Sequence, residues 1–142
     1  MRTLVIEDSK FLRQAIERAF TRAGHTVSTA NDGEEGVRVA HETAPDLVLL
    51  DMMLPKLGGL DVLRMLKTDA NTKDIPVIVL TSLSERNKEK LLREGAAAYV
   101  EKSSTLLENN STALLQAVTA VIGSVDQFDS DYQHCRGSLP NQ

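Results

Sequence analysis

The chain has 142 residues, of which 42% are apolar and 25% charged, with a formal net charge of −4 at pH 7. This length suits one domain that buries its own core, and the single cysteine, Cys135, excludes an internal disulfide. The acidic balance disfavours direct contact with nucleic acid, and no apolar run approaches the roughly 20 residues that cross a bilayer. With no signal peptide at the N-terminus, we expect a cytoplasmic protein without membrane insertion.

The first part of the chain alternates short apolar runs with helical patterns. Residues 3–6 are typical of a buried strand. Ser9 can cap a helix that ends at Gly24, and its predicted apolar face comprises Phe11, Leu12, Ala15, Ile16, Ala19 and Phe20. Residues 25–30 alternate as a second strand would. Asp32 with Glu35 forms a capping-box pattern, which predicts a helix running to about residue 42.

The second part continues the alternation. Residues 46–50 are predicted as a central parallel strand covered on both faces, because residues 47–50 form a continuous apolar run. A loop with Pro55 and Gly58-Gly59 precedes a helix over 60–67 whose inward residues are Val62, Leu63 and Leu66. The remaining predicted elements are a strand over 75–80, a helix capped by Ser82 and Glu85 and ended by Gly95, a strand over 98–100 and a helix over 106–122. The polar residues 124–142 are expected to form a flexible tail after a domain of residues 1–123.

Five successive strand–helix units predict a parallel sheet with right-handed crossovers and helices on both faces. In such sheets ligands bind beyond the carboxyl ends of the strands. Polar side chains stand at four of the five predicted strand ends, namely Glu7-Asp8, Asp51, Thr81 and Lys102. Three carboxylates, a hydroxyl and an ammonium are therefore expected at one edge of the sheet.

This predicted cluster needs positive charge. Two carboxylates about 4 Å apart repel by about 4 kcal/mol at an effective dielectric constant of about 20. Mg²⁺ suits carboxylate oxygens, keeps several waters and bridges readily to phosphate. A neutralised carboxylate such as Asp51 can attack phosphorus as a nucleophile, while cations balance the charge of the transferring group. The pattern predicts phosphoryl chemistry at Asp51, with Lys102 and Thr81 as contacts of the phosphoryl group.

At these residues the sequence resembles the receiver domains of bacterial two-component response regulators, of the single-domain chemotaxis type. The resemblance covers residues 2 to about 123. It is carried by four motifs in order and spacing, which are Val5-Ile6-Glu7-Asp8, Leu49-Leu50-Asp51-Met52-Met53-Leu54-Pro55 with Gly59, Val79-Leu80-Thr81-Ser82, and Tyr99-Val100-Glu101-Lys102. The implied fold is α/β: a flavodoxin-like doubly wound (βα)5 three-layer sandwich, whose parallel five-stranded sheet has the strand order 2-1-3-4-5.

The resemblance implies that Asp51 accepts a phosphoryl group from a histidine kinase or phosphotransfer protein. It also implies that Glu7, Asp8, Asp51 and the backbone carbonyl of Met53 hold Mg²⁺. The expected activity is that of a phosphoacceptor, which catalyses only its own phosphorylation and dephosphorylation and is otherwise no enzyme.

The resemblance further implies a switch. Thr81 would move to hydrogen-bond the phosphoryl group, Lys102 would pair with it, and Tyr99 would swing inward as Thr81 moves. The expected output surface is residues 83–123, which would bind a downstream protein target or output domain. A homodimer through the last helices is left open.

The sequence departs from the family pattern after Lys102, where the family usually has proline, often after a cis bond. Here Ser103 follows. A cis bond before serine would cost about 3 kcal/mol, so we expect a trans bond and a rearranged loop around Lys102. In the family, residues at the positions of Met53 and Leu83 tune hydrolysis of the aspartyl phosphate. These two apolar side chains give little help in placing a water, which predicts a long-lived phosphoryl state.

Two alternatives belong to other functional classes. Some phosphohydrolases place a nucleophilic Asp after a parallel strand, but they typically carry a second Asp two positions later, where this chain has Met53. Nucleotide- or flavin-binding modules of the same topology cradle phosphate in a Ser/Thr/Gly-rich loop after the first strand. This chain has Glu7-Asp8-Ser9-Lys10 there, whose carboxylates would repel phosphate in the absence of a metal.

Overall fold

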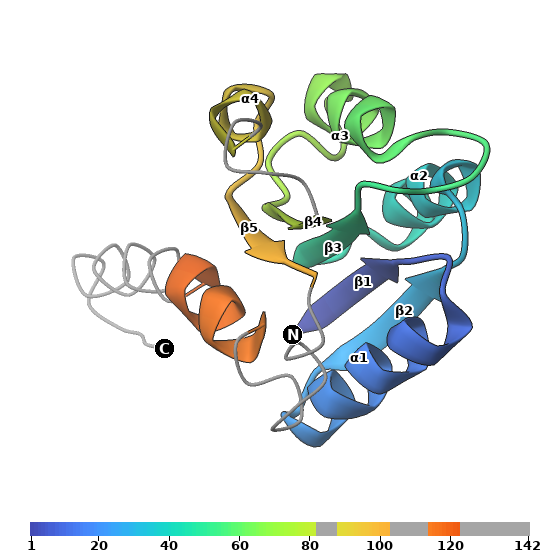
Figure 1. Cartoon of the computed structure of the whole chain (residues 1–142), viewed down its shortest axis with the longest axis vertical. Coiled ribbons are helices and arrows are strands. Elements are labelled where there is room, and N and C mark those ends of the chain that lie inside the picture. The colour runs from blue at the N-terminus through green and yellow to red at the C-terminus, as the bar shows by residue number, and fades with distance from the viewer. Residues whose placement is uncertain (82–87, 103–113, 123–142) are drawn as a thin grey trace.

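The computed structural model describes residues 1–81, 88–102 and 114–122, and within them a five-stranded parallel sheet of order β2-β1-β3-β4-β5 (Figure 1). The strands are β1 Arg2–Ile6, β2 Thr26–Ala30, β3 Leu47–Asp51, β4 Val77–Thr81 and β5 Ala98–Glu101. The helices are α1 Lys10–Arg22, α2 Gly33–Thr43, α3 Gly59–Thr68 and α4 Lys88–Arg93, and residues 114–122 are also helical. This confirms the predicted fold class and strand order.

Alternate side chains of the central strands enter two separate cores, one on each face of the sheet. On one face, Leu4 and Ile6 of β1 pack in a core with residues of α2, α3 and α4. On the other face, Val5 of β1 packs with residues of α1 and of helix 114–122. Figure 1 shows the same division, with α2, α3 and α4 on one side of the sheet and α1 and the last helix on the other. The molecule therefore has three layers, and β3 is buried along its whole length.

Two of the predicted helix caps form as the sequence indicates. Ser9 Oγ accepts a hydrogen bond from the Leu12 amide at 3.3 Å, and Asp32 Oδ1 accepts one from the Glu35 amide at 2.8 Å. The Glu35 side chain accepts a hydrogen bond from the Asn31 amide at 2.7 Å, whereas a capping box would pair it with the Asp32 amide. Each cap satisfies amides that the first helical turn leaves unpaired, which fixes where α1 and α2 leave the strands.

One prediction about α1 is wrong. Phe11 was expected on the apolar face of the helix, but its side chain is 62% exposed, whereas Ile16, Ala19 and Phe20 are buried. Successive helical residues are about 100° apart, so a stripe centred on Ile16 includes Leu12 and excludes Phe11. On α3, the predicted inward residues Val62, Leu63 and Leu66 are all buried, which confirms that face.

The central strands begin and end later than predicted. Pro76 lacks an amide proton, and β4 starts one residue beyond it, at Val77. Asp51 and Thr81 are the last residues of β3 and β4, instead of following them. Both side chains are therefore held by paired backbone at the edge of the sheet.

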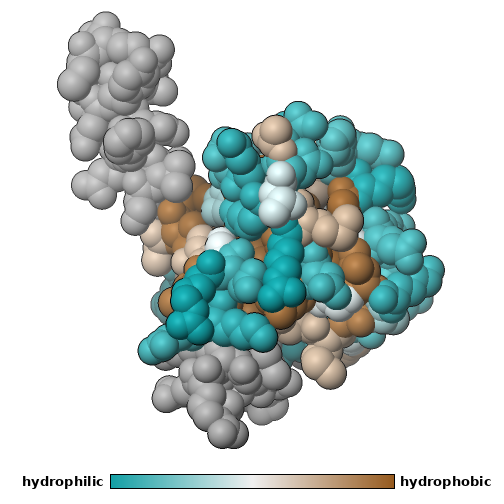
Figure 2. Space-filling view, turned by 90° about the horizontal axis from the view of Figure 1, so that it is seen from above, coloured by the Kyte–Doolittle hydropathy of each residue, from teal (hydrophilic) through white to brown (hydrophobic). Residues whose placement is uncertain are grey.

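Several predicted features lie outside the described residues. They are the helix cap at Ser82 and Glu85, the part of the last helix before residue 114 and the tail of residues 124–142. In the parts of the chain that are described, no helix is long and apolar enough to cross a membrane. Figure 2 shows a face on which hydrophilic side chains cover most of the coloured surface, with apolar side chains visible between them.

The turn from β3 into α3 leaves no room for a side chain at Gly59. A Cβ atom there would lie 2.5 Å from Met52 Cα and 2.6 Å from the Asp51 carbonyl oxygen, whereas a Cβ at the neighbouring Gly58 would have its nearest neighbour, Asp61 Oδ2, at 4.0 Å. We expect Gly59→Ala to lower the free energy of unfolding by roughly 1–3 kcal/mol, because backbone has to move. Gly58→Ala should change it by no more than about 0.5 kcal/mol, since the cost of alanine at a helix N-cap and the loss of glycine's unfolded-state freedom oppose each other. Urea titrations of both variants measure this, and equal losses would contradict the packing seen at Gly59.

Candidate functional site

Two carboxylates are buried side by side at the carboxyl edge of the sheet. Asp51 ends β3, and Glu7 directly follows β1, the strand that pairs with β3 through Ile6 and Leu50. The exposed fraction of Glu7 is 0% and that of Asp51 is 1%. The neighbouring Asp8 is exposed, yet a carboxylate oxygen from each of the three residues lies within 4.8 Å of the others. The structure thus brings together the three predicted carboxylates.

Lys102 bridges the two buried carboxylates. Its Nζ lies 3.2 Å from Glu7 Oε1 and 3.2 Å from Asp51 Oδ2, to which it donates a hydrogen bond. Its backbone amide donates to the Thr81 carbonyl oxygen at 2.7 Å, which anchors the start of its side chain at the edge of β4. Lys102 therefore reaches Asp51 in this structure although Ser103 follows it. The Lys102–Ser103 peptide bond, which we expected to be trans, lies outside the described residues.

Glu7 remains poorly compensated despite this partner. Its Oε2 accepts a hydrogen bond from the Ser9 amide at 3.0 Å, but the buried Oε1 accepts none from the described residues. Burial raises the pKa of Glu7 to about 7; the Ser9 amide opposes this rise and the nearby Asp51 adds to it. Burial alone would lower the pKa of Lys102, but the carboxylates of Glu7 and Asp51 outweigh that effect and raise it. The cluster is therefore short of positive charge near neutral pH.

This arrangement fits a divalent cation. A hard ion such as Mg²⁺ takes oxygen ligands, and the site offers three clustered carboxylates, one of them with a buried oxygen that accepts no hydrogen bond from the described residues. Met53 lies beside them, since its amide donates to Asp51 Oδ1 at 3.1 Å, while its side chain is 66% exposed. Among the described residues no other group of three or more His, Cys, Asp or Glu side chains could hold a metal ion.

The two predicted switch residues lie on neighbouring strands. Thr81 is buried at the end of β4, with its backbone in register with Glu101 of β5. Tyr99 lies opposite Val79 on β5, where it is half-buried and packs against the core on the side of α2 and α3. The Lys102 amide is hydrogen-bonded to the Thr81 carbonyl oxygen, and Tyr99 lies on β5, three residues before Lys102, which directly follows that strand. Thr81 thus ends the strand next to the one that Asp51 ends, and Tyr99 lies one strand further along the sheet.

One polar contact at the site was not predicted from the sequence. Arg13 Nη1 donates a hydrogen bond to the Glu7 carbonyl oxygen at 2.9 Å. The only available signal was a cationic residue one turn beyond the Ser9 cap, and such a residue usually lies in solvent.

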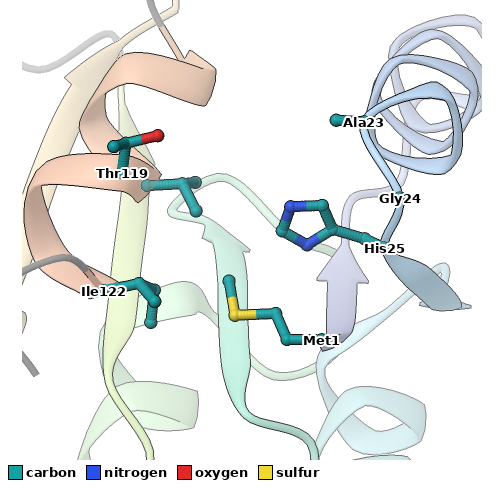
Figure 3. A pocket seen from close by; sticks show the side chains of 7 residues that line it. Met1, Ala23, Gly24, His25, Thr119 and Ile122 are labelled. Atoms are coloured by element: carbon teal, nitrogen blue, oxygen red, sulfur yellow. The ribbon is translucent and has the colours of Figure 1, made fainter. Parts of the chain in front are cut away.

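A separate hollow of about 330 Å³ opens at the opposite edge of the sheet, near the amino ends of β1 and β2. Figure 3 shows His25 and Met1 facing Thr119 and Ile122 of the last helix across it. His25 contacts Thr3 Oγ1 through Nδ1 at 3.0 Å and packs edge-on against Phe20, with ring centroids 5.0 Å apart. These contacts account for His25 as a packing residue, and the hollow is not part of the carboxylate cluster.

Comparison with known proteins places this geometry in a family. Residues 3–118 match the model of the response regulator receiver domain. The chain is 40% identical over 100 residues to the transcriptional regulatory protein AfsQ1 of Streptomyces coelicolor, which covers 70% of this chain and 43% of that protein. It is 33% identical over 134 residues to the DNA-binding dual master transcriptional regulator RpaA of Synechocystis, covering 94% and 54% respectively. The chain thus spans about half the length of these curated relatives.

Solved structures show the same fold. The chemotaxis response regulator CheY4 of Vibrio cholerae superposes with a TM-score of 0.76 at 26% identity, covering 84% of this chain and 97% of that one. A response regulator receiver domain protein from Clostridium thermocellum superposes with a TM-score of 0.76 at 31% identity, covering 89% and 98%.

The raised pKa of Glu7 makes stability depend on pH. Because the pKa is about 7 in the folded chain against an ordinary 4.5, the contribution of this group is fully present below about pH 4.5 and is lost as the pH rises through about 7. In EDTA, the free energy of unfolding of Glu7→Gln should therefore rise relative to that of the wild type by on the order of 1–3 kcal/mol between about pH 5 and pH 8. Mg²⁺ should remove the difference by stabilising the wild type. Urea unfolding at both pH values, with Glu17→Gln as control, tests this, and parallel curves for wild type and Glu7→Gln would contradict it.

Proposed function

This chain belongs to the response regulator receiver domain family and acts in phosphorelay signalling, and from that premise we propose that Asp51 is the residue that accepts the phosphoryl group. The observation that carries the proposal is the pairing of Asp51 Oδ2 with Lys102 Nζ at 3.2 Å, beside a carboxylate cluster suited to a cation. A carboxylate so placed is a nucleophile whose charge is already partly balanced.

The proposed reaction is a transfer between two proteins. An oxygen of Asp51 forms a bond to phosphorus as the P–N bond of a phosphohistidine breaks, and the electron pair of that bond returns to the imidazole nitrogen. Receiver domains take phosphoryl groups from histidine kinases or related phosphodonors, and this chain is a phosphoacceptor module of that kind rather than a classical enzyme. Beyond that, we propose that it catalyses only its own phosphorylation and dephosphorylation.

Receiver domains bind Mg²⁺ at an acidic pocket, and in this chain Glu7, Asp8 and Asp51 would hold it, with the Met53 carbonyl as a further ligand. When bound, the ion supplies positive charge that balances the transferring phosphoryl group. The chain's own part is to hold the oxygens in place: Glu7 is fixed by the Ser9 amide, and Asp51 by the Met53 amide and Lys102. Because Glu7 and Asp51 are buried, their orientation needs little reorganisation when the donor arrives.

The proposed switch follows from the connection of Lys102 to Thr81. Lys102 would turn toward the phosphoryl oxygens, Thr81 would donate its hydroxyl to them, and Tyr99 would move inward from its half-buried position. Moving a two-state equilibrium from 1:99 to 99:1 takes about 5.5 kcal/mol of differential interaction. A new charge-assisted pair, a new hydrogen bond and the further burial of an aromatic ring together are of that order.

The proposed output is binding to a protein. The signalling surface would be residues 83–123, presented by a domain of residues 1–123 in the cytoplasm, with no direct contact to nucleic acid and no membrane insertion. The similarity of fold to CheY4 of Vibrio cholerae supports a single-domain, chemotaxis-type regulator. AfsQ1 and RpaA, named as transcriptional regulators, are about twice as long as the matched region. These relatives support the alternative proposal, in which the receiver domain acts on an output domain of the same chain. A homodimer is compatible with either alternative.

Phosphorylation of Asp51 is tested by intact mass. After incubation with Mg²⁺ and a small phosphodonor, the wild type should gain one phosphoryl group, and Asp51→Asn should gain none, because an amide lacks the nucleophilic carboxylate. Asp46→Asn, which changes a carboxylate just before β3, serves as the matched control and should be labelled like the wild type. Equal labelling of wild type and Asp51→Asn would overturn the assignment. Steady release of phosphate from a phosphoester substrate would instead favour a phosphohydrolase.

The lifetime of the phosphoryl group is the next expectation. Met53 lies beside Asp51 and exposes an apolar side chain, which offers no hydrogen bond to an attacking water. Leu83, the other residue named for this role, lies outside the described residues. We expect decay over minutes or longer, and faster decay in Met53→Asn than in Met65→Asn, which alters an exposed methionine on α3. Phosphate release from purified phosphoprotein measures both rates, and decay of the wild type within seconds would contradict the expectation.

A further inference from the structure

Arg13 contacts the backbone that carries two of the three clustered carboxylates. It lies in the first part of α1, and its Nη1 donates to the Glu7 carbonyl oxygen at 2.9 Å. Its own amide donates to the Ser9 carbonyl oxygen at 2.8 Å. The side chain and backbone of Arg13 therefore hold both ends of the corner between β1 and α1.

With Arg13 in place, Glu7 is fixed at three points. Its amide donates to the Ala30 carbonyl oxygen at 3.0 Å, its side chain accepts from the Ser9 amide at 3.0 Å, and its carbonyl oxygen accepts from Arg13. The Glu7 carbonyl belongs to the peptide unit that joins Glu7 to Asp8. Because a peptide unit is planar, fixing this oxygen also fixes the position of the Asp8 Cα atom, from which the side chain starts.

Asp8 depends on that backbone more than Glu7 does. Its side chain is exposed and forms no hydrogen bond or ion pair with any residue that the structure describes. Nothing on the side chain itself therefore keeps its carboxylate within 4.8 Å of those of Glu7 and Asp51. The backbone on either side of Asp8, including the peptide plane that Arg13 contacts, therefore sets where this carboxylate lies.

The contact is not an ordinary ion pair. In the described parts of the chain Arg13 makes no ion pair with Glu7 or Asp8, whereas Lys102 Nζ lies 3.2 Å from an oxygen of Glu7. A guanidinium suits this task because it stays charged at any working pH and presents rigid, planar donors. Lys102 thus balances charge at the cluster, whereas Arg13 binds the backbone of Glu7.

We propose that Arg13 is a positioning residue of the metal site, which holds the Glu7–Asp8 peptide so that both carboxylates face Asp51. The inference rests on the proposed binding of Mg²⁺ at these carboxylates. It also predicts the direction in which removal of Arg13 changes the affinity for Mg²⁺. A cation that acted only through its charge would repel Mg²⁺, so its removal would tighten binding, whereas loss of a positioning contact weakens binding.

The test measures the dissociation constant of Mg²⁺ alone, by calorimetry and by amide NMR shifts of Glu7 and Asp8, on the full chain. Arg13→Met should weaken binding by about tenfold, as loss of an outer contact to a metal ligand does. Arg18→Met, which removes the same charge from an exposed site on the same helix, should leave binding unchanged or slightly tighter. Arg13→Lys keeps the charge without the planar guanidinium, so its dissociation constant for Mg²⁺ should lie between those of the wild type and Arg13→Met.

Urea unfolding in EDTA separates positioning from folding, and Arg13→Lys supplies the comparison if Arg13→Met is the less stable protein. Binding by Arg13→Met as tight as by Arg18→Met, or tighter, would overturn the inference. Absence of Mg²⁺ binding by the wild type would overturn it too. Wild type that binds Mg²⁺ with the expected Arg13 dependence but gains no phosphoryl group would refute the proposed role of Asp51 and leave the inference on Arg13 standing.

Discussion

The site depends on one interaction, the bridge that Lys102 makes between the buried carboxylates of Glu7 and Asp51. Two such charges about 4 Å apart would repel by about 4 kcal/mol at an effective dielectric constant of about 20, and burial adds the loss of their hydration. One ammonium at 3.2 Å from each offsets part of this cost. The pKa of Glu7, raised to about 7 by burial and held there beside Asp51, shows that the compensation is incomplete. The negative charge at the carboxyl edge of the sheet is therefore only partly balanced by Lys102.

The rest of the fold makes this unfavourable cluster possible. Asp51 ends a strand that is buried along its whole length, so its backbone is held by neighbours on both sides. The contact of Gly59 with the Asp51 and Met52 backbone, and the contact of Arg13 with the Glu7 carbonyl, hold the two turns that leave the sheet beside it. Without these contacts the two turns would be more flexible, and the carboxylates could move apart and no longer form the site.

The sequence predicts most of the scaffold, because apolar periodicity and caps are local signals. The largely apolar strands, the caps at Ser9 and Asp32, and the residues gathered at the strand ends all follow from short-range pattern and parallel topology. Phe11 was misplaced because it was assigned to the apolar face for its hydrophobicity, although its position lies about 140° around the helix from Ile16. Neither the unequal burial of Glu7 and Asp8 nor the contact of Arg13 with a carbonyl could be predicted, since they depend on how the turn after β1 is built.

The shortage of positive charge also bears on how the proposed switch would work. A phosphoryl group on Asp51 would replace the single negative charge of its carboxylate with about −1.5 to −2 units of charge, next to an ammonium already shared by two carboxylates. Lys102 would then divide its single positive charge between the phosphoryl group and Glu7, so that the Glu7 carboxylate would need the metal ion or a proton as well. Because the amide of Lys102 is bonded to the Thr81 carbonyl oxygen, that change at the side chain occurs on backbone shared by β4 and β5. The same unsatisfied electrostatics that would attract the ion would thus connect phosphorylation to the strand that carries Tyr99.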